Sequence, residues 1–205
     1  KNPPALIVKT NRGSSSLTDR VYTKKMIQSI KDSVGSNKLP NIYLLNSDLS
    51  DAEVNALYNH SKVKAHLSFT RGEGFGRPLL EATISGKPMV VSAWSGHVDF
   101  LNKDMVNLIG GGLTNVHESA ADKFLLKEAQ WFQIDYSVAG GTMKDIHKNY
   151  KPYLEKSRKH RQYTKDRFTW GHMRDLLSEQ LKEADESKVS PTAVGLQLPK
   201  LKKVK

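Results

Sequence analysis

The chain has 205 residues, enough for one sizeable core, and its 38% hydrophobic and 26% charged content is typical of a globular protein. It contains no cysteine, which excludes disulfides, thiolate metal sites and cysteine nucleophiles. The net charge of +11 favours anionic partners: nucleotide phosphates, an acidic membrane surface or another polyanion, or nucleic acid. The charge alone does not choose among these partners, and it also fits a surface that is basic only for solubility.

Two features bear on the location and extent of the protein. No apolar run approaches the roughly 18 residues that span a bilayer. The first residues, 1–4, contain neither an initiator methionine nor a targeting signal. We therefore expect a cytoplasmic protein, and we interpret the sequence as part of a longer chain.

Strand and helix patterns alternate over the first two thirds of the chain. Short apolar or alternating runs predict five strands, at residues 5–8, 41–45, 65–69, 89–92 and 106–109. Helical spacing and capping residues predict helices between them, at residues 17–34, from residue 51, and at 77–85, with a helical turn at 96–101. This order predicts an α/β fold with a mostly parallel sheet and helices on both faces.

Local signals also predict where these helices begin and end. Ser50 and Glu53 have the spacing of a capping box. Gly35 and Gly86 are expected to close two of the helices. The first helix is expected to have an apolar face formed by Val21, Met26, Ile27 and Ile30.

The pattern changes after Trp131 to long helices, predicted at residues 137–149, 152–168 and 170–186. We assign residues 1–184 to one domain that ends in these helices. Residues 185–205 contain two prolines and clustered lysines and lack periodicity, so they predict an extended basic tail.

The segment 70–82 carries the strongest functional signal, because it follows a strand, is rich in glycine and opens a helix. Ligands bind in this position at the carboxyl edge of a parallel sheet. Gly74 and Gly76 let a ligand approach the main chain closely. The amides around Phe75, Gly76 and Arg77 then predict a binding site for an anion such as a diphosphate.

Two carboxylates flank this turn. Glu73 precedes it, and Glu81 follows after seven intervening residues, inside the helix. Carboxylates at these two places can accept hydrogen bonds from hydroxyl groups on either side of a diphosphate. A second loop of small residues, 92–97, follows the next strand at the same edge. The alternative is that both glutamates are ordinary surface charges.

The pair Glu73…Glu81 resembles the E-x7-E motif of retaining GT-B glycosyltransferases, in particular family 4. Other stretches resemble the family in order and spacing, namely residues 51–58, 86–91, 95–96 and 167–170. The resemblance implies the C-terminal half of a GT-B fold. Residues 1–184 would form a Rossmann-like, nucleotide-sugar-binding domain, and its last helices would cross over to another domain.

The resemblance also implies roles for individual residues. Glu73 would be the catalytic-site carboxylate at the transferred sugar, and Glu81 would hold the ribose of the nucleotide. The donor's sugar or phosphates would be contacted by the loop residues Gly74, Phe75, Gly76 and Arg77.

A basic pair usually neutralises the diphosphate in this family. Lys9 and Arg12 are the nearest candidates, although the usual G-R-x4-K-G wording is absent. No D-x-D motif occurs, so no metal and no other cofactor is expected.

The function implied is sugar transfer from a nucleotide-diphosphate sugar with retention of configuration. The acceptor pocket would belong to an N-terminal GT-B domain missing from this sequence. The chain alone would then not catalyse sugar transfer. Met173, Leu176 and Leu177 would then be partly uncovered. Three alternatives remain: a glucosyltransferase acting on a nucleic-acid base, which is not favoured, a non-catalytic nucleotide-sugar-binding module, and a sugar epimerase.

Overall fold

The computed structural model describes residues 4–10, 16–36 and 38–186. The strands found there are β1 (Ala5–Lys9), β2 (Asn41–Leu45), β3 (His66–Ser68), β4 (Met89–Ser92), β5 (Asn107–Ile109), β6 (Gly111–Asn115) and β7 (Gln130–Ile134). The helices are α1 (Leu17–Ser33), α2 (Asp51–Asn59), α3 (Arg77–Thr83), α4 (Tyr136–Lys148), α5 (Tyr150–Arg167) and α6 (Trp170–Glu186), with 3-10 turns η1 (Gly96–Asp99) and η2 (Glu118–Ala120).

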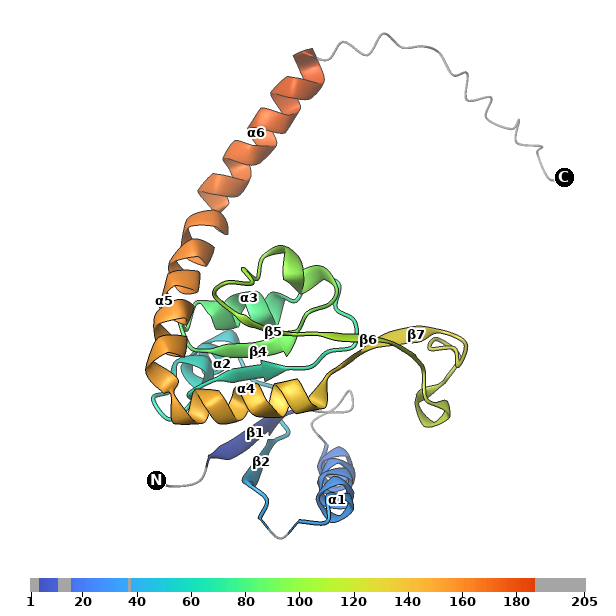
Figure 1. Ribbon diagram of the computed structural model, residues 1–205. Coiled ribbons are helices and arrows are strands. Elements are labelled where there is room, and N and C mark those ends of the chain that lie inside the picture. The colour runs from blue at the N-terminus through green and yellow to red at the C-terminus, as the bar shows by residue number, and fades with distance from the viewer. Residues whose placement is uncertain (1–3, 11–15, 37, 187–205) are drawn as a thin grey trace, which may run out of the picture. The chain divides into compact units, whose positions relative to one another are not determined.

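The predicted fold class is confirmed, because parallel strands alternate with helices that flank them (Figure 1). The strands do not form one continuous sheet. β3, β4 and β5 form one parallel sheet, β1 and β2 form a separate parallel pair, and β6 and β7 form an antiparallel pair.

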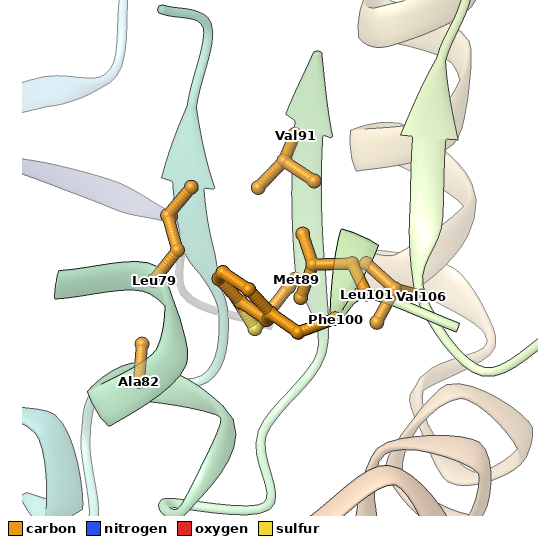
Figure 2. Close-up of a cluster of buried hydrophobic side chains, with 7 residues drawn as sticks. All are labelled: Leu79, Ala82, Met89, Val91, Phe100, Leu101 and Val106. Carbon is orange, nitrogen blue, oxygen red and sulfur yellow. The ribbon is translucent and has the colours of Figure 1, made fainter. Parts of the chain in front are cut away.

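The core lies on the two faces of β4, since successive side chains of a strand point to opposite faces. Met89 and Val91 pack on one face against α3 and against the segment that joins β4 to β5. Figure 2 shows this cluster, which consists of Leu79, Ala82, Met89, Val91, Phe100, Leu101 and Val106.

Val90 points to the other face of β4 and is fully buried. It packs there with Ile109, with Phe132 and Ile134 of β7, and with side chains of α4. Figure 1 accordingly shows α3 on one side of the three-stranded sheet and α4 on the other. Helices therefore cover both faces, as the sequence predicts.

The helix ends follow their local signals. Ser50 accepts a hydrogen bond from the Glu53 amide at 3.3 Å, and the Glu53 carboxylate accepts one from the Ser50 amide at 2.8 Å, which confirms the capping box. Gly35 and Gly86 follow the ends of α1 and α3 with φ of 62° and 66°. Both glycines adopt the left-handed conformation that closes a helix.

The expected apolar face of α1 is not buried. Val21, Met26 and Ile30 keep 46%, 48% and 60% of their surface exposed. The two-stranded sheet of β1 and β2 offers too small a layer to cover this face. The buried side chains of this region are polar instead: Asn46 donates to the Asp19 carboxylate at 3.3 Å.

The sequence patterns predict no strand at Gly111–Asn115, but the structure has one there. Gly111 to Asn115 form β6, which pairs in antiparallel register with β7. A Cβ on Gly111 would lie 2.0 Å from the Gln133 carbonyl oxygen, so only glycine allows this close pairing.

The chain divides into two compact units, Lys1–Arg161 and Gln162–Lys205. In the second unit, α6 begins after Thr169, whose hydroxyl accepts a hydrogen bond from the His172 amide at 3.1 Å. Met173, Leu176 and Leu177 are about half exposed, as expected. Of the predicted basic tail, residues 187–205 lie outside the described residues. In the described part of the chain, no helix is long and apolar enough to cross a membrane.

Candidate functional site

Two loops meet at the carboxyl edge of the three-stranded sheet. The first, which we call the glycine loop, comprises residues 70–76 between β3 and α3. The second, the serine loop, comprises residues 93–96 after β4. Because β3 and β4 are neighbouring parallel strands, both loops leave the sheet at the same edge.

Ser95 and Gly96 hold the main chain of Glu73. The Ser95 hydroxyl accepts a hydrogen bond from the Glu73 amide at 2.9 Å and donates one to the Glu73 carbonyl at 2.5 Å. The Gly96 amide donates a further hydrogen bond to the same carbonyl at 2.9 Å. The predicted catalytic residue is therefore fixed through its backbone by the serine loop.

The backbones of the two loops also approach each other closely at glycine residues. A Cβ on Gly96 would lie 1.7 Å from the carbonyl oxygen of Gly74. Gly76 has φ of 87°, and a Cβ there would lie 2.9 Å from the Cβ of His97. Glycine is required at both positions, because any side chain would separate the loops.

Ser95 has an unusual backbone conformation, with φ of 80° and ψ of −171°. Among the residues that the structure describes, it is the one non-glycine residue with positive φ. This region of the map is almost restricted to glycine and costs about 1–3 kcal/mol for other residues. Such strain is concentrated at functional sites, so it supports a functional role for this edge.

The glycine loop ends at the start of α3, where Gly76 is the N-cap and Pro78 lies in the first turn. The Gly76 carbonyl accepts hydrogen bonds from the amides of Leu79 and Leu80 at 2.8 and 3.1 Å. The amides of Phe75, Gly76 and Arg77 have no hydrogen-bond partner within the described ranges. The sequence predicts an anion site at these amides.

The second carboxylate lies on the exposed side of α3. Glu81 forms an ion pair with Arg77, 3.2 Å from Oε1 to Nε, and both side chains are well exposed, at 45% and 76%. An exposed pair of this kind contributes little to stability. Burial, and then the charge of Glu81, raise the pKa of Tyr58. Glu81 therefore lies near Tyr58 of α2.

His97 packs beneath the surface, next to the serine loop. Its side chain is completely buried, and its Nε2 donates a hydrogen bond to the Ser92 carbonyl at 2.7 Å. The Ser92 hydroxyl in turn donates to the Thr70 carbonyl at 2.9 Å. This chain of contacts connects β4 to the first residue of the glycine loop. His97 is thus a fully buried packing residue.

An aromatic group beside the two loops was not predicted from the sequence. The guanidinium of Arg71 lies 3.6 Å from the ring centre of Trp131. The Trp94 ring stacks on that of Phe132, with 5.5 Å between centroids and 4° between planes. The Phe132 amide donates to the Arg71 carbonyl at 3.1 Å, which ties β7 to the glycine loop. The only feature of the sequence that could have indicated this aromatic group is the position of Trp94 in the serine loop.

No strand pairing that the structure describes places the predicted basic pair, Lys9 and Arg12, at this edge of the three-stranded sheet. Lys9 ends β1, in the separate two-stranded sheet, and pairs in register with Leu45. Arg12 lies outside the described residues. A groove of about 500 Å³ lies near Lys9's sheet, between α1 and β2, but no predicted site residue lines it. From α1 it is lined by Arg20, Lys24, Ile27, Gln28 and Lys31.

No group of three or more histidine, aspartate or glutamate side chains is placed to bind a metal ion in residues 4–10, 16–36 and 38–186. The sheet edge offers instead amides without a partner among the described residues and one glutamate, Glu73, that is fixed by its backbone, while the exposed carboxylate of Glu81 lies farther along α3. Together these groups can bind a ligand that carries both phosphate and hydroxyl groups.

Comparison with known protein families agrees with this geometry. Residues 26–127 match the family of group 1 glycosyl transferases. The match spans about half of the chain, includes both loops and α3, and ends before β7. No curated protein matches the chain. The glycosyl transferase match supports a role in glycosyl transfer, and therefore a transferase.

Proposed function

We propose that the chain is the donor-binding domain of a retaining glycosyltransferase of the GT-B kind, similar to family 4, with a nucleoside-diphosphate sugar as donor. The match to group 1 glycosyl transferases supports the class of reaction. The glycine loop is the observation that supports a nucleoside-diphosphate sugar as the donor. Its backbone is fixed by Ser95, and the amides of Phe75, Gly76 and Arg77 have no partner among the described residues.

The proposed chemistry depends on charge at the leaving group. When the bond between sugar and phosphate breaks, negative charge develops on the diphosphate. The amides of Phe75, Gly76 and Arg77 point from a fixed loop and can stabilise this charge without rearranging. We propose that Lys9 and Arg12 add positive charge at the phosphates and that no metal takes part.

The two carboxylates have separate roles in this proposal. Glu81 accepts hydrogen bonds from the ribose hydroxyls, and its exposed side chain is accessible to a ligand. Glu73 contacts hydroxyl groups of the transferred sugar next to the reacting carbon. The hydrogen bonds from Ser95 and Gly96 to its backbone support this role, because they fix the start of its side chain.

A second Rossmann-like domain would supply the acceptor pocket in this proposal. The exposed apolar side chains of α6, including Met173, Leu176 and Leu177, are consistent with contacts outside this unit. By itself the chain is then expected to bind donor but not to transfer sugar.

The proposal is tested by thermal unfolding with UDP, GDP, ADP and TDP. At least one nucleotide should raise the melting temperature, because a ligand that binds only the folded state stabilises it. Glu81→Ala should weaken that binding by about 1–3 kcal/mol through loss of a charge-assisted hydrogen bond. Glu155→Ala removes an exposed glutamate of α5 and should bind as wild type does. The proposal fails if no nucleotide stabilises the chain, or if Glu81→Ala binds unchanged.

The net charge of +11 favours a second candidate function, a transferase that glycosylates a nucleic-acid base, because nucleic acid is a polyanion. Binding of single-stranded DNA that weakens steeply with salt would favour it, and absence of such binding would dismiss it. A non-catalytic module would bind the nucleotide equally well, but the complete protein would then neither transfer nor hydrolyse the donor.

A further inference from the structure

The exposed ring of Trp94 is the least expected feature of the sheet edge. One of its faces is covered by Phe132, which is itself only 6% exposed, and the two rings are nearly parallel. Trp94 nevertheless keeps 41% of its surface exposed. The exposed part is therefore the opposite face and the ring edges. A large apolar ring held flat in this way is a ready surface for stacking.

The position of Trp94 is fixed at both ends of the serine loop. On one side, the Ala93 amide donates a hydrogen bond to the Ile109 carbonyl at 2.9 Å. On the other side, the Ser95 hydroxyl holds the Glu73 backbone. The indole is thus attached one residue from the group that fixes Glu73. A ring stacked on Trp94 would lie beside the site proposed for the transferred sugar.

We propose, on the basis of the proposed function, that the exposed face of Trp94 binds a sugar ring of the acceptor at the edge of the pocket that the second domain would supply. The C–H bonds on one face of a pyranose ring carry partial positive charge and meet the negative face of an aromatic ring favourably. The hydroxyl groups at the ring edge remain free to form hydrogen bonds. The acceptor of this transferase is thereby assigned to the carbohydrates.

The local charge favours a neutral ring over a nucleobase in a nucleic-acid strand. Binding of single-stranded nucleic acid combines aromatic stacking with a continuous basic groove. No lysine or arginine occurs between residues 88 and 102, a stretch that includes Trp94 and the acidic residue Asp99. Arg71 already lies over the ring of Trp131. The serine loop itself therefore offers no cation to a phosphate backbone.

Saturation-transfer NMR on the full chain tests this inference, with the methyl glycosides of glucose, galactose, mannose and N-acetylglucosamine as probes. Wild type should transfer magnetisation to the ring protons of at least one glycoside. Trp94→Ala should weaken that binding on the order of tenfold, and Trp94→Phe should retain most of it. Trp170→Ala is the matched control, since Trp170 is an exposed tryptophan of α6 in the other unit.

Three outcomes would overturn the inference: no response to any glycoside, an equal response in wild type and Trp94→Ala, or a response only to an oligothymidine strand. Thermal shift with nucleoside diphosphates on the same samples separates the two proposals. A shift in both proteins without any effect of Trp94→Ala on glycosides contradicts the acceptor assignment alone. Absence of a nucleotide shift in wild type contradicts the proposed function itself.

Discussion

The hydroxyl of Ser95 accepts a hydrogen bond from the amide of Glu73 and donates one to its carbonyl, at 2.9 and 2.5 Å. One side chain thus satisfies both backbone polar groups of a residue 22 positions earlier in the chain. Ser95 forms these contacts from a strained conformation, with φ of 80°. The hydroxyl is therefore what stabilises the geometry of the glycine loop.

Ser95→Ala should destabilise the protein by about 1–3 kcal/mol, because it keeps the strain and removes the acceptor of the Glu73 amide. The Glu73 carbonyl keeps its hydrogen bond from the Gly96 amide. Ser95→Gly loses the same hydrogen bonds but relieves the strain, so it should be the more stable of the two variants. Chemical denaturation measures both free energies of unfolding. Equal stability of Ser95→Ala and wild type would contradict the role of the hydroxyl.

Gly96→Ala should be strongly destabilising, on the order of 3 kcal/mol, because the new Cβ would lie 1.7 Å from the Gly74 carbonyl oxygen. Nucleotide binding should fall as well, since the two loops must separate. Gly72→Ala is the control in the same loop, because a Cβ there meets nothing within 4 Å. If the two variants have the same melting temperature, the loops do not touch as described.

His66 should make the stability depend on pH. Burial, and then the charge of Lys87, lower the pKa of His66 to about 4, and its Nε2 lies 3.0 Å from the Ser85 hydroxyl. In the unfolded chain the pKa should be about 6.5. Between these values the unfolded chain binds the extra proton and the folded chain does not, so stability present above pH 6.5 falls as the pH approaches 4.

The measurement is the free energy of unfolding against pH for wild type and His66→Gln, which cannot titrate. The difference between the two curves should change over this pH window and be constant above it. A difference that is constant from pH 7 down to about pH 4 would show that His66 titrates normally.

Glu73→Ala should separate catalysis from nucleotide binding in a preparation of the complete enzyme. Since Glu73 is proposed to contact the transferred sugar and not the nucleotide, the Kd for nucleoside diphosphate should change little. The rate of transfer should fall by about a hundredfold or more. Steady-state kinetics and calorimetry give the two values, and equal losses in both would argue against separate roles for Glu73 and Glu81.

Features that depend on neighbouring residues were predictable from the sequence. The strands Asn41–Leu45 and Met89–Ser92 have the predicted bounds, because their apolar runs end in turn residues. The capping box of Ser50 and Glu53 forms within one turn of helix. The alternation of such elements determines the α/β class, and the glycine loop was located because its glycines and proline act locally.

Contacts between distant segments were decided only by the tertiary structure. Gly111 and Gly112 form a strand against the low strand preference of glycine, because Ile134 and Gln133 of the distant strand β7 supply the pairing partners. Ser95 has its strained conformation at the place where its hydroxyl bonds to Glu73, 22 residues earlier in the chain. The stack of Trp94 on Phe132 likewise joins two elements that no sequence pattern relates. Local preference determines which elements form, whereas their packing determines which side chains meet at the sheet edge.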